Sequence, residues 1–536
     1  MSVPVAERGG TRQRSGGIGR AAVLIGALTM LARVIGFGRQ VVFAHTVQAG
    51  CLGTAYTTAN MVPNIIYDVV LGGALTAVVV PVLAGPASDR EQARQTSAAL
   101  LTWTVVLLAP VSLVVAVTAR PLVTLLLDGA PGCPRTSMIT LGTRMLVVFA
   151  PQILLYGLAV VLYGILQSHR RFAAPALAPV MSSLLVIGAY FWFRAVGNGY
   201  QDMARPAPTA AWVILAAGTT AGVAALVATP LVPFTRLRLA LRPALRFPAG
   251  VGTRVRSLAV AGLATLVAQD ASVAVVIVLA NSRGGDGSLV LYSFAWAVFF
   301  VPYAVLAVPI ATSAFPELSA RSDDFDATSA TSTRAVTVAS WLGVAVMAGT
   351  CIPLARVFQS HIGQAADARR LAIALVAFAP GLVGYGLTAN LSRVLYALGR
   401  SRAAAAAVSG GWLLVIVADL LIVPFVSRSA VVGWLGAGTT IGLTGSGAVL
   451  LLLVHRLRGP RALRGWTRAA LAGLAGAAAG AAAGLGVSVA VPVRGFLPNA
   501  AVTLLASAAV LAAFLTVVAL ADGGDLRAVL RRAVRT

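Results

Sequence analysis

Ala27-Leu-Thr-Met-Leu-Ala-Arg33-Val-Ile-Gly-Phe-Gly-Arg39-Gln40 places two arginines inside an apolar segment that is long enough to cross a bilayer. An arginine at the centre of a membrane helix costs about 2.5 to 3.5 kcal/mol on insertion scales, so it normally faces a protein interior or a water-filled cavity. Arg33 follows Arg20 by about 18 Å of helix, which places it near mid-membrane. Arg39 lies closer to the outer interface, where snorkelling to the headgroups is the alternative. The segment predicts a membrane helix that presents positive charge to an anion.

The rest of the chain has the same apolar character. Of its 536 residues, 58% are hydrophobic and 11% are charged. Polar spacers separate apolar runs of about 20 residues, the length of a membrane-spanning helix. This pattern predicts an all-α polytopic membrane protein. About fourteen spans are expected, near residues 21–47, 56–84, 97–119, 140–167, 174–193, 210–233, 257–281, 290–316, 335–355, 371–398, 403–426, 430–454, 469–490 and 498–521.

The distribution of charge predicts the orientation. All 41 basic residues are arginine, and the net charge is +25. The arginines gather in the N-terminal tail, at Arg236–Arg256 and at Arg456–Arg468, which all fall on one predicted side of the membrane. By the positive-inside rule we expect a multi-pass protein of the plasma membrane with both termini cytoplasmic, and we expect no nucleic-acid partner. The apolar part after Arg20 is too long for a signal peptide and contains Arg33, so it predicts the first span.

Two sequence echoes predict a repeated bundle, because both recur at an offset of about 230 to 240 residues. Val62-Pro-Asn is echoed by Val301-Pro-Tyr, and Tyr156-Gly-Leu by Tyr385-Gly-Leu. The expected division is a cytoplasmic tail at 1–20, an N-lobe of six spans at 21–233, a basic cytoplasmic linker at 234–256, a C-lobe of six spans at 257–457, two further spans at 458–521 and a cytoplasmic tail at 522–536.

The three cysteines match no metal or redox motif. Cys51 and Cys133 fall in predicted outer loops, and Cys351 falls in a span. A disulfide between Cys51 and Cys133 is geometrically possible, but two unpaired cysteines are the simpler expectation.

The second span carries a polar stripe. Asn60, Asn64 and Asp68 repeat at i, i+4 and i+8 and therefore share one helix face. Two interpretations stay open. The stripe forms a structural salt-bridge network with the arginines of the first span, or it lines a cavity in which Asn64 and Asp68 contact a substrate and Asp68 holds a coupling cation.

Residues that disturb helices gather in the first two spans. Glycine permits close packing or a bend, and we expect Pro63 to interrupt the second helix. The candidate hinges are Gly36, Gly38, Pro63, Gly72 and Gly73.

Later spans supply a candidate second cavity wall. Asp270 lies in the seventh span, Asn390 and Arg393 lie three residues apart in the tenth, and Asp419 lies in the eleventh. Asp270 is a second candidate cation site. None of these residues has metal-ligand spacing, so neither a metal site nor a cofactor is expected.

Enzyme motifs are absent from the sequence. Glycine-rich stretches such as Gly436-Ala-Gly438 lack the Gly-Lys-Ser/Thr ending of a Walker loop, and the chain has no lysine. No Ser/His/Asp set or paired carboxylates stand out for hydrolysis. We therefore expect a transporter rather than an enzyme.

Several segments together resemble the MurJ/MviN family, especially its actinobacterial branch, within the multidrug/oligosaccharidyl-lipid/polysaccharide exporter superfamily. They are Ala32-Arg-Val-Ile-Gly-Phe-Gly-Arg39, Asn60-Met-Val-Pro-Asn-Ile-Ile-Tyr-Asp through Pro81, Arg171-Phe-Ala-Ala-Pro-Ala-Leu-Ala-Pro179, and Phe294-Ala-Trp-Ala through Phe315-Pro-Glu-Leu-Ser319. The resemblance covers nearly all of the chain and is strongest in the first two spans.

The resemblance implies two six-helix lobes in a V, with two extra C-terminal helices that form a lipid-facing groove. It implies a flippase that moves lipid II, the lipid-linked disaccharide-pentapeptide, to the outer leaflet for peptidoglycan synthesis. Membrane lipids and cell-wall synthesis proteins are the other partners it implies. By motif, Arg33 and Arg39 match the cavity arginines that are taken to bind the diphosphate.

The sequence departs from the family pattern at three places. Tyr67 and Asp68 stand where many members carry an arginine, Thr54 stands at the position of an acidic residue, and Ala297 stands at the position of the eighth-helix arginine. A third anchor for the diphosphate is therefore unassigned, and Arg393 is the candidate by depth and charge. The alternatives to lipid II flipping are export of another lipid-linked glycan or of a drug, or a non-transporting scaffold of cell-wall synthesis.

Overall fold

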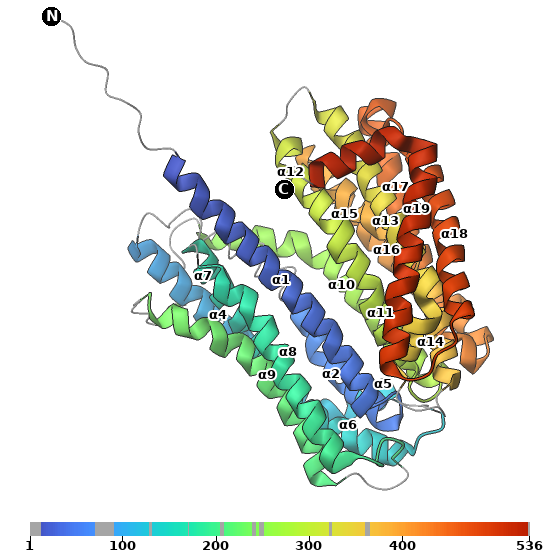
Figure 1. Ribbon diagram of the computed structural model, residues 1–536. Helices are drawn as coiled ribbons and strands as arrows, with labels where there is room; N and C mark the ends of the chain where they lie inside the picture. Colours follow the sequence, from blue (N-terminus) through green and yellow to red (C-terminus); the bar gives the residue numbers. More distant parts are fainter. Residues whose placement is uncertain are drawn as a thin grey trace, which may run out of the picture.

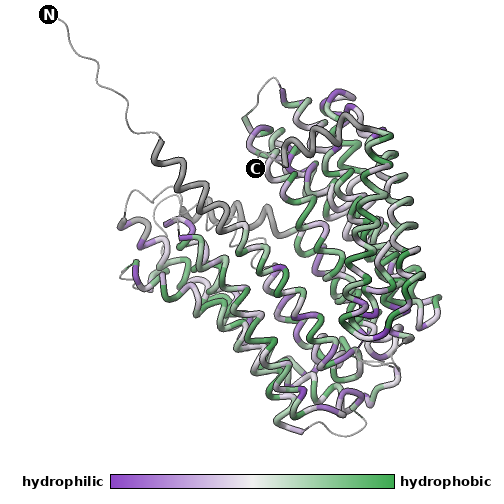
Figure 2. The backbone as a smooth tube through the Cα atoms, viewed as in Figure 1, coloured by the Kyte–Doolittle hydropathy of each residue, from purple (hydrophilic) through white to green (hydrophobic). Residues whose placement is uncertain are grey.

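The structure is a computed structural model that describes residues 12–69, 90–127, 131–169, 171–203, 208–237, 243–245, 251–320, 324–359 and 365–533. All regular secondary structure within these ranges is helical, which confirms the predicted all-α class. Figure 2 shows hydrophobic colouring along most of the helix lengths and hydrophilic colouring mainly at the helix ends, the distribution that a bilayer imposes on spanning helices.

The first half of the chain forms eight described helices: α1 (Arg12–Thr46), α2 (Cys51–Val69), α4 (Arg90–Val117), α5 (Ala119–Leu127), α6 (Arg135–Phe149), α7 (Gln152–Ser168), α8 (Ala173–Gly197) and α9 (Thr209–Thr235). The second half forms α10 (Val251–Arg283), α11 (Ser288–Pro302), the π-helical turn η3 (Tyr303–Ala307), α12 (Val308–Ser319), α13 (Phe325–Val357), α14 (Ala365–Phe378), α15 (Gly381–Ala397), α16 (Ser401–Ile422), α17 (Val431–Arg458), α18 (Trp466–Ala490) and α19 (Phe496–Ala533).

The number of membrane helices agrees with the expected fourteen as far as the described residues reach. Twelve described helices are long and apolar enough to span a bilayer, or thirteen when α14 and α15, bent by 42°, count as one span. The remaining expected span, 56–84, begins as α2 and passes into residues that are not described, so its length stays a prediction. The candidate hinges Gly72 and Gly73 lie in that part and are likewise outside the described residues.

The helices form two bundles that diverge toward one end of the molecule (Figure 1). In the first, α8 packs against α1 and α9, and α7 packs against α4 and α9. In the second, α17 packs against α14, α15 and α16, while α18 and α19 pack against each other and against α13. The start of α1 and the end of α19 both lie at the divergent end of the molecule (Figure 1). The lobe boundaries given above remain a prediction.

The bundles meet at the opposite end, called here the closed end and formed around Thr54, Thr58, Asn281 and Gly287. The backbone N–H of Gly287 donates to Thr54 Oγ1 (3.1 Å). Asn281 Nδ2 donates to Thr58 Oγ1 (3.0 Å) and to the carbonyl of Leu126 (2.8 Å). Each bond joins the second bundle to the first, so this end of the molecule is held shut by buried polar contacts.

Gly287 allows the bundles to approach at this point. Its φ is +71°, and a Cβ added there would lie 2.1 Å from the carbonyl oxygen of Ala49 in the other bundle. Only glycine combines that backbone conformation with so close a contact.

Gly287→Ala is therefore expected to weaken the closed end, whereas Gly285→Ala is the matched control. Gly285 also has a positive φ (+81°), but no described atom lies within 4 Å of its Cβ position. Both variants carry the backbone strain of about 1–2 kcal/mol, and only Gly287→Ala adds the clash. Thermal unfolding in detergent should show a lower Tm for Gly287→Ala than for Gly285→Ala, and spin-label distances between exposed positions 125 and 369 should lengthen for Gly287→Ala alone. The same Tm and the same spin-label distance in both variants would show that the close approach at Gly287 does not hold the closed end together.

Cys51 and Cys133 form a disulfide, so the expectation of two unpaired cysteines is wrong. The bond joins the start of α2 to the segment before α6, across a sequence separation of 82 residues. Spacing alone did not favour the bond, because the approach of the two cysteines depends on the packing of α2 against α6. Cys351 is free and buried.

Thiol labelling checks this pairing. After denaturation without reductant, a maleimide probe should modify one thiol per chain, that of Cys351, and after reduction it should modify three. In the Cys351→Ser variant the probe should modify no thiol before reduction and two thiols after it. Three labelled thiols without reductant would show that the disulfide does not form.

Candidate functional site

On the first bundle, Tyr67 of α2 and Tyr156 of α7 form a ring pair, called here the N-side pair. Their centroids lie 4.2 Å apart, and the Tyr156 hydroxyl donates to Asn64 Oδ1 at 2.9 Å. The positive charge of Arg39 lies within electrostatic range of the Tyr156 hydroxyl. Arg39 is partly buried. This intermediate burial leaves both interpretations of Arg39 given above open.

The path of α2 corrects one expectation. Pro63 does not interrupt the helix, which runs unbroken from Cys51 to Val69. The chain therefore keeps Asn64 and Asp68 one helical turn apart on the same face, as their spacing predicts.

On the second bundle, Tyr303 of η3 and Tyr385 of α15 form the corresponding C-side pair. The rings are stacked, with centroids 3.9 Å apart and planes inclined by 22°. The charge of Arg393 lies within electrostatic range of the Tyr303 hydroxyl, and Arg393 Nη1 donates to the carbonyl of Ala389 in its own helix at 2.6 Å. Each ring pair thus has an arginine beside it.

Asp68 lies where the two bundles face each other. Its charge is within electrostatic range of Tyr67 on its own bundle and of Tyr385 on the other. Asp270 of α10 is buried, with 5% of its surface exposed. Asp270 Oδ2 has no hydrogen-bond partner among the described residues. The two predicted cation-site candidates are thus contributed by different bundles, Asp68 by α2 and Asp270 by α10.

Arg33 makes a separate contact between the bundles. Its guanidinium carbon lies 4.9 Å from the ring centroid of Phe300 in α11, a cation–π distance. The α1 helix is continuous through Gly36 and Gly38, and added Cβ atoms at these glycines would meet no described atom within 4 Å. These glycines are therefore not close-packing positions in this conformation.

A family profile described as "Lipid II flippase MurJ" matches residues 43–503. The chain belongs to the MurJ family. The "Lipid II flippase MurJ" of Burkholderia cenocepacia is 26% identical over 57% of the chain and 58% of its own length. The "Probable lipid II flippase MurJ" of Rhizobium tropici is 25% identical over 55% of the chain and 54% of its own length. The chain thus aligns with little more than half the length of these relatives.

Solved structures show that the MurJ fold extends over almost the whole chain. A lipid II flippase MurJ in an inward closed conformation matches with a TM-score of 0.70 at 17% identity, over 92% of this chain and 99% of that one. An inward-facing multidrug resistance MATE family transporter matches with a TM-score of 0.63 at 14% identity. This match covers 82% of this chain and 98% of the transporter. MurJ membership and the many apolar helices establish a multi-pass inner-membrane protein of a transporter family.

Two residues expected on the second wall of this MurJ-family protein lie elsewhere. Asn390 is fully buried and donates to Thr333 of α13 at 3.0 Å. Asp419 is buried between α16 and α17, where its Oδ1 occupies the space that a Cβ on Gly438 would need. No group of three or more His, Cys, Asp or Glu side chains suited to a metal occurs among the described residues.

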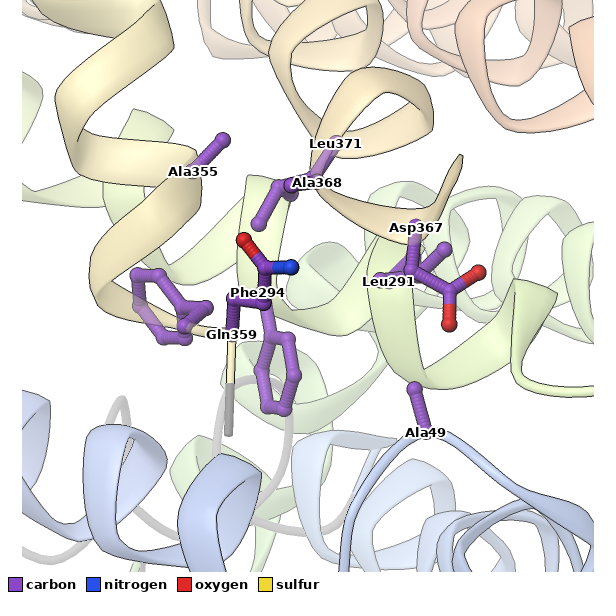
Figure 3. Close-up of a pocket in the computed structure, with 9 residues that line it drawn as sticks. Ala49, Leu291, Phe294, Ala355, Gln359, Asp367, Ala368 and Leu371 are labelled. Carbon is purple, nitrogen blue, oxygen red and sulfur yellow. The ribbon is translucent and has the colours of Figure 1, made fainter. Parts of the chain in front are cut away.

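A small cavity at the closed end is separate from the tyrosine pairs (Figure 3). It has room for about one water molecule, and Ala49 of the first bundle faces residues of α11, α13 and α14 across it. The rings of Phe294 and Phe358 stack in its wall, with 4.9 Å between their centroids. Asp367 is the charged residue among those that line it. None of the predicted site residues lines this cavity.

The residues that the sequence reasoning missed are aromatic. Tyr156, Tyr303, Tyr385 and Phe300 were not candidates, because a tyrosine or phenylalanine in a membrane helix has no distinctive spacing. The echo between Tyr156-Gly-Leu and Tyr385-Gly-Leu was the available signal. Tyr156 follows Pro151 by five residues, and Tyr385 follows Pro380 by five residues; each proline caps the start of its helix.

A double-mutant cycle tests the contact between Arg33 and Phe300. Removing both side chains (Arg33→Met, Phe300→Leu) should give a coupling energy of about 0.5 to 2 kcal/mol in reversible detergent unfolding, the range of cation–π pairs. The cycle of Arg39→Met with Phe300→Leu is the control and should give a smaller value. Zero coupling for Arg33 would show that the ring does not hold this guanidinium.

Proposed function

We propose that this protein is a lipid II flippase that moves the undecaprenyl-diphosphate-linked disaccharide-pentapeptide from the inner to the outer leaflet for peptidoglycan synthesis. The observation that carries the proposal is Arg33. It lies within a membrane helix, and its guanidinium carbon lies 4.9 Å from the ring centroid of Phe300. The N–H groups of its guanidinium make no hydrogen bond to the described residues. Membership in the MurJ family supports the same substrate.

The chemistry of Arg33 suits a diphosphate. A guanidinium contacts an aromatic ring through its face, which leaves the N–H groups on its edge available for a bidentate contact with phosphate oxygens. Such charge-assisted bonds strengthen away from bulk water. Arg39 and Arg393 are the further proposed anchors, and Asn64 and Asp68 complete the proposed substrate contacts.

Transport then requires the site to open to each side in turn. The two bundles converge at the closed end and diverge at the end where α1 begins (Figure 1), which supports rocking of one bundle against the other. Disulfides persist in oxidising compartments, and the Cys51–Cys133 bond lies at the start of α2, beside the closed end. This supports an outer location for the closed end and cytoplasmic termini. Gly36, Gly38, Pro63, Gly72 and Gly73 are the proposed hinges.

Asp68 and Asp270 are the proposed coupling site. Two neighbouring carboxylates repel when both are ionised, so a proton or a small cation between them would stabilise the approach of the bundles. Exchange of that cation would then bias the conformational equilibrium. Cell-wall synthesis proteins remain the proposed partners.

Complementation of cells depleted of their own flippase tests the function. Wild type should restore growth and outer-leaflet lipid II. Arg33→Ala should lower outer-leaflet lipid II about tenfold or more, because a hydrogen bond to a charged group contributes about 1.5–3 kcal/mol. Arg33→Lys should restore part of the activity, since it keeps the charge and loses the planar fork.

Arg144→Ala is the control for loss of an arginine from a membrane helix. Arg144 lies in α6, with its guanidinium carbon 6.0 Å from the ring centroid of Trp212, and this variant should behave as wild type. Full activity of Arg33→Ala would overturn the diphosphate role of Arg33. Failure of wild type would favour another lipid-linked glycan, a drug, or a scaffold.

A further inference from the structure

One tyrosine of each pair occupies an equivalent place in the internal repeat. Tyr156 and Tyr385 occupy the same position in the two echoes, five residues after a helix-capping proline. Their partners, Tyr67 and Tyr303, lie near the prolines of the other echo but at different positions, four residues after Pro63 and one residue after Pro302. Each bundle thus holds one ring pair, with centroids 4.2 Å apart in the first bundle and 3.9 Å apart in the second.

The N-side pair lies beside the polar face of α2, since Asn64 and Asp68 flank Tyr67 in that helix. Asn64 lies one helical turn from Asp68 and accepts the hydrogen bond from Tyr156. All four rings are partly exposed, and Tyr385 also stacks on Phe299 with 6.0 Å between the ring centroids. The N-side pair thus keeps aromatic surface available beside the amide of Asn64 and the carboxylate of Asp68.

This combination of groups fits a carbohydrate. The C–H face of a pyranose ring is apolar and weakly positive, so it packs on the negative face of an aromatic ring. Hydroxyl and acetamido groups at its edge need hydrogen-bond donors and acceptors that are held in place, which a carboxylate and an amide supply. A diphosphate has no use for the rings, since it is recognised by arginine forks.

We propose that the N-side pair (Tyr67 and Tyr156) and the C-side pair (Tyr303 and Tyr385) are platforms for the sugar rings of the substrate headgroup, with Asn64 and Asp68 binding its polar edge. The inference rests on the proposed function, because it assigns a subsite for the disaccharide next to the diphosphate anchors. Arg39 beside one pair and Arg393 beside the other place positive charge where a sugar joins the diphosphate.

Binding of lipids that differ only in sugar content tests this assignment. The ligands are undecaprenyl diphosphate carrying no sugar, one sugar, or the complete disaccharide-pentapeptide, measured on the purified full-length protein by native mass spectrometry. Wild type should prefer the sugar-bearing lipids. Tyr67→Leu and Tyr385→Leu should each reduce that preference by about tenfold, the effect of losing one stacked ring.

Matched variants separate stacking from folding. Tyr67→Phe and Tyr385→Phe keep the ring and should keep the preference, whereas Tyr396→Leu, on the exposed face of α15, should bind as wild type does. Arg33→Ala should weaken binding of all three lipids equally. If a leucine variant does not fold, Tyr67→Met or Tyr385→Met takes its place and should show the same loss of preference.

The outcomes distinguish the two proposals. Equal binding of bare and sugar-bearing diphosphate by wild type, or unchanged preference in both folded leucine variants, would overturn the sugar platforms and leave the flippase proposal intact. Absence of binding to every diphosphate lipid would overturn the flippase proposal and the platforms with it.

Discussion

The desolvation cost of charge at membrane depth is the constraint on which the centre of this molecule depends. A guanidinium or carboxylate placed among lipid tails is unstable, so each must find a ring, an opposite charge, a polar neighbour or water. Arg33 has the ring of Phe300, and Arg393 donates to the carbonyl of Ala389. The partner of Arg33 is aromatic, which stabilises the cation without neutralising it and leaves it able to attract an anion.

The same constraint links the site to the two-bundle architecture. A single bundle buries its polar groups among its own helices, as Asn390 does against Thr333. Asp68 and Asp270 come from different bundles, so the distance between them changes with the separation of the bundles. The closed end limits that separation through Gly287, Thr54 and Asn281. The electrostatic state of the acids and the separation of the bundles are therefore coupled variables.

The sequence predicted those features that depend on local properties. The length of apolar runs fixes the spans, and the spacing of Asn64 and Asp68 fixes their shared face, because both follow from helix geometry alone. The continuous path through Pro63 was not predictable in this way, since neighbouring helices restore the backbone contacts that proline removes. The Cys51–Cys133 bond and the ring pairs were missed for a related reason. Each joins residues that are far apart in the chain, and only helix packing brings them together.

Tyr67 and Asp68 stand where the family resemblance implies an arginine, and this difference bears on the proposed binding site. With an arginine at that position, the resemblance implies a denser group of cations that would bind a diphosphate through charge alone. Here the position supplies a ring that packs on Tyr156, and the next residue, Asp68, supplies a negative charge. An added acid weakens any site for a bare polyanion. The arrangement is favourable only if the ligand offers something beside its charge, namely an apolar ring face and hydroxyl groups that a carboxylate accepts. On the proposed assignment, loss of a cationic anchor and gain of a tyrosine platform are therefore one change, in which part of the electrostatic affinity is replaced by contact with the uncharged part of the headgroup.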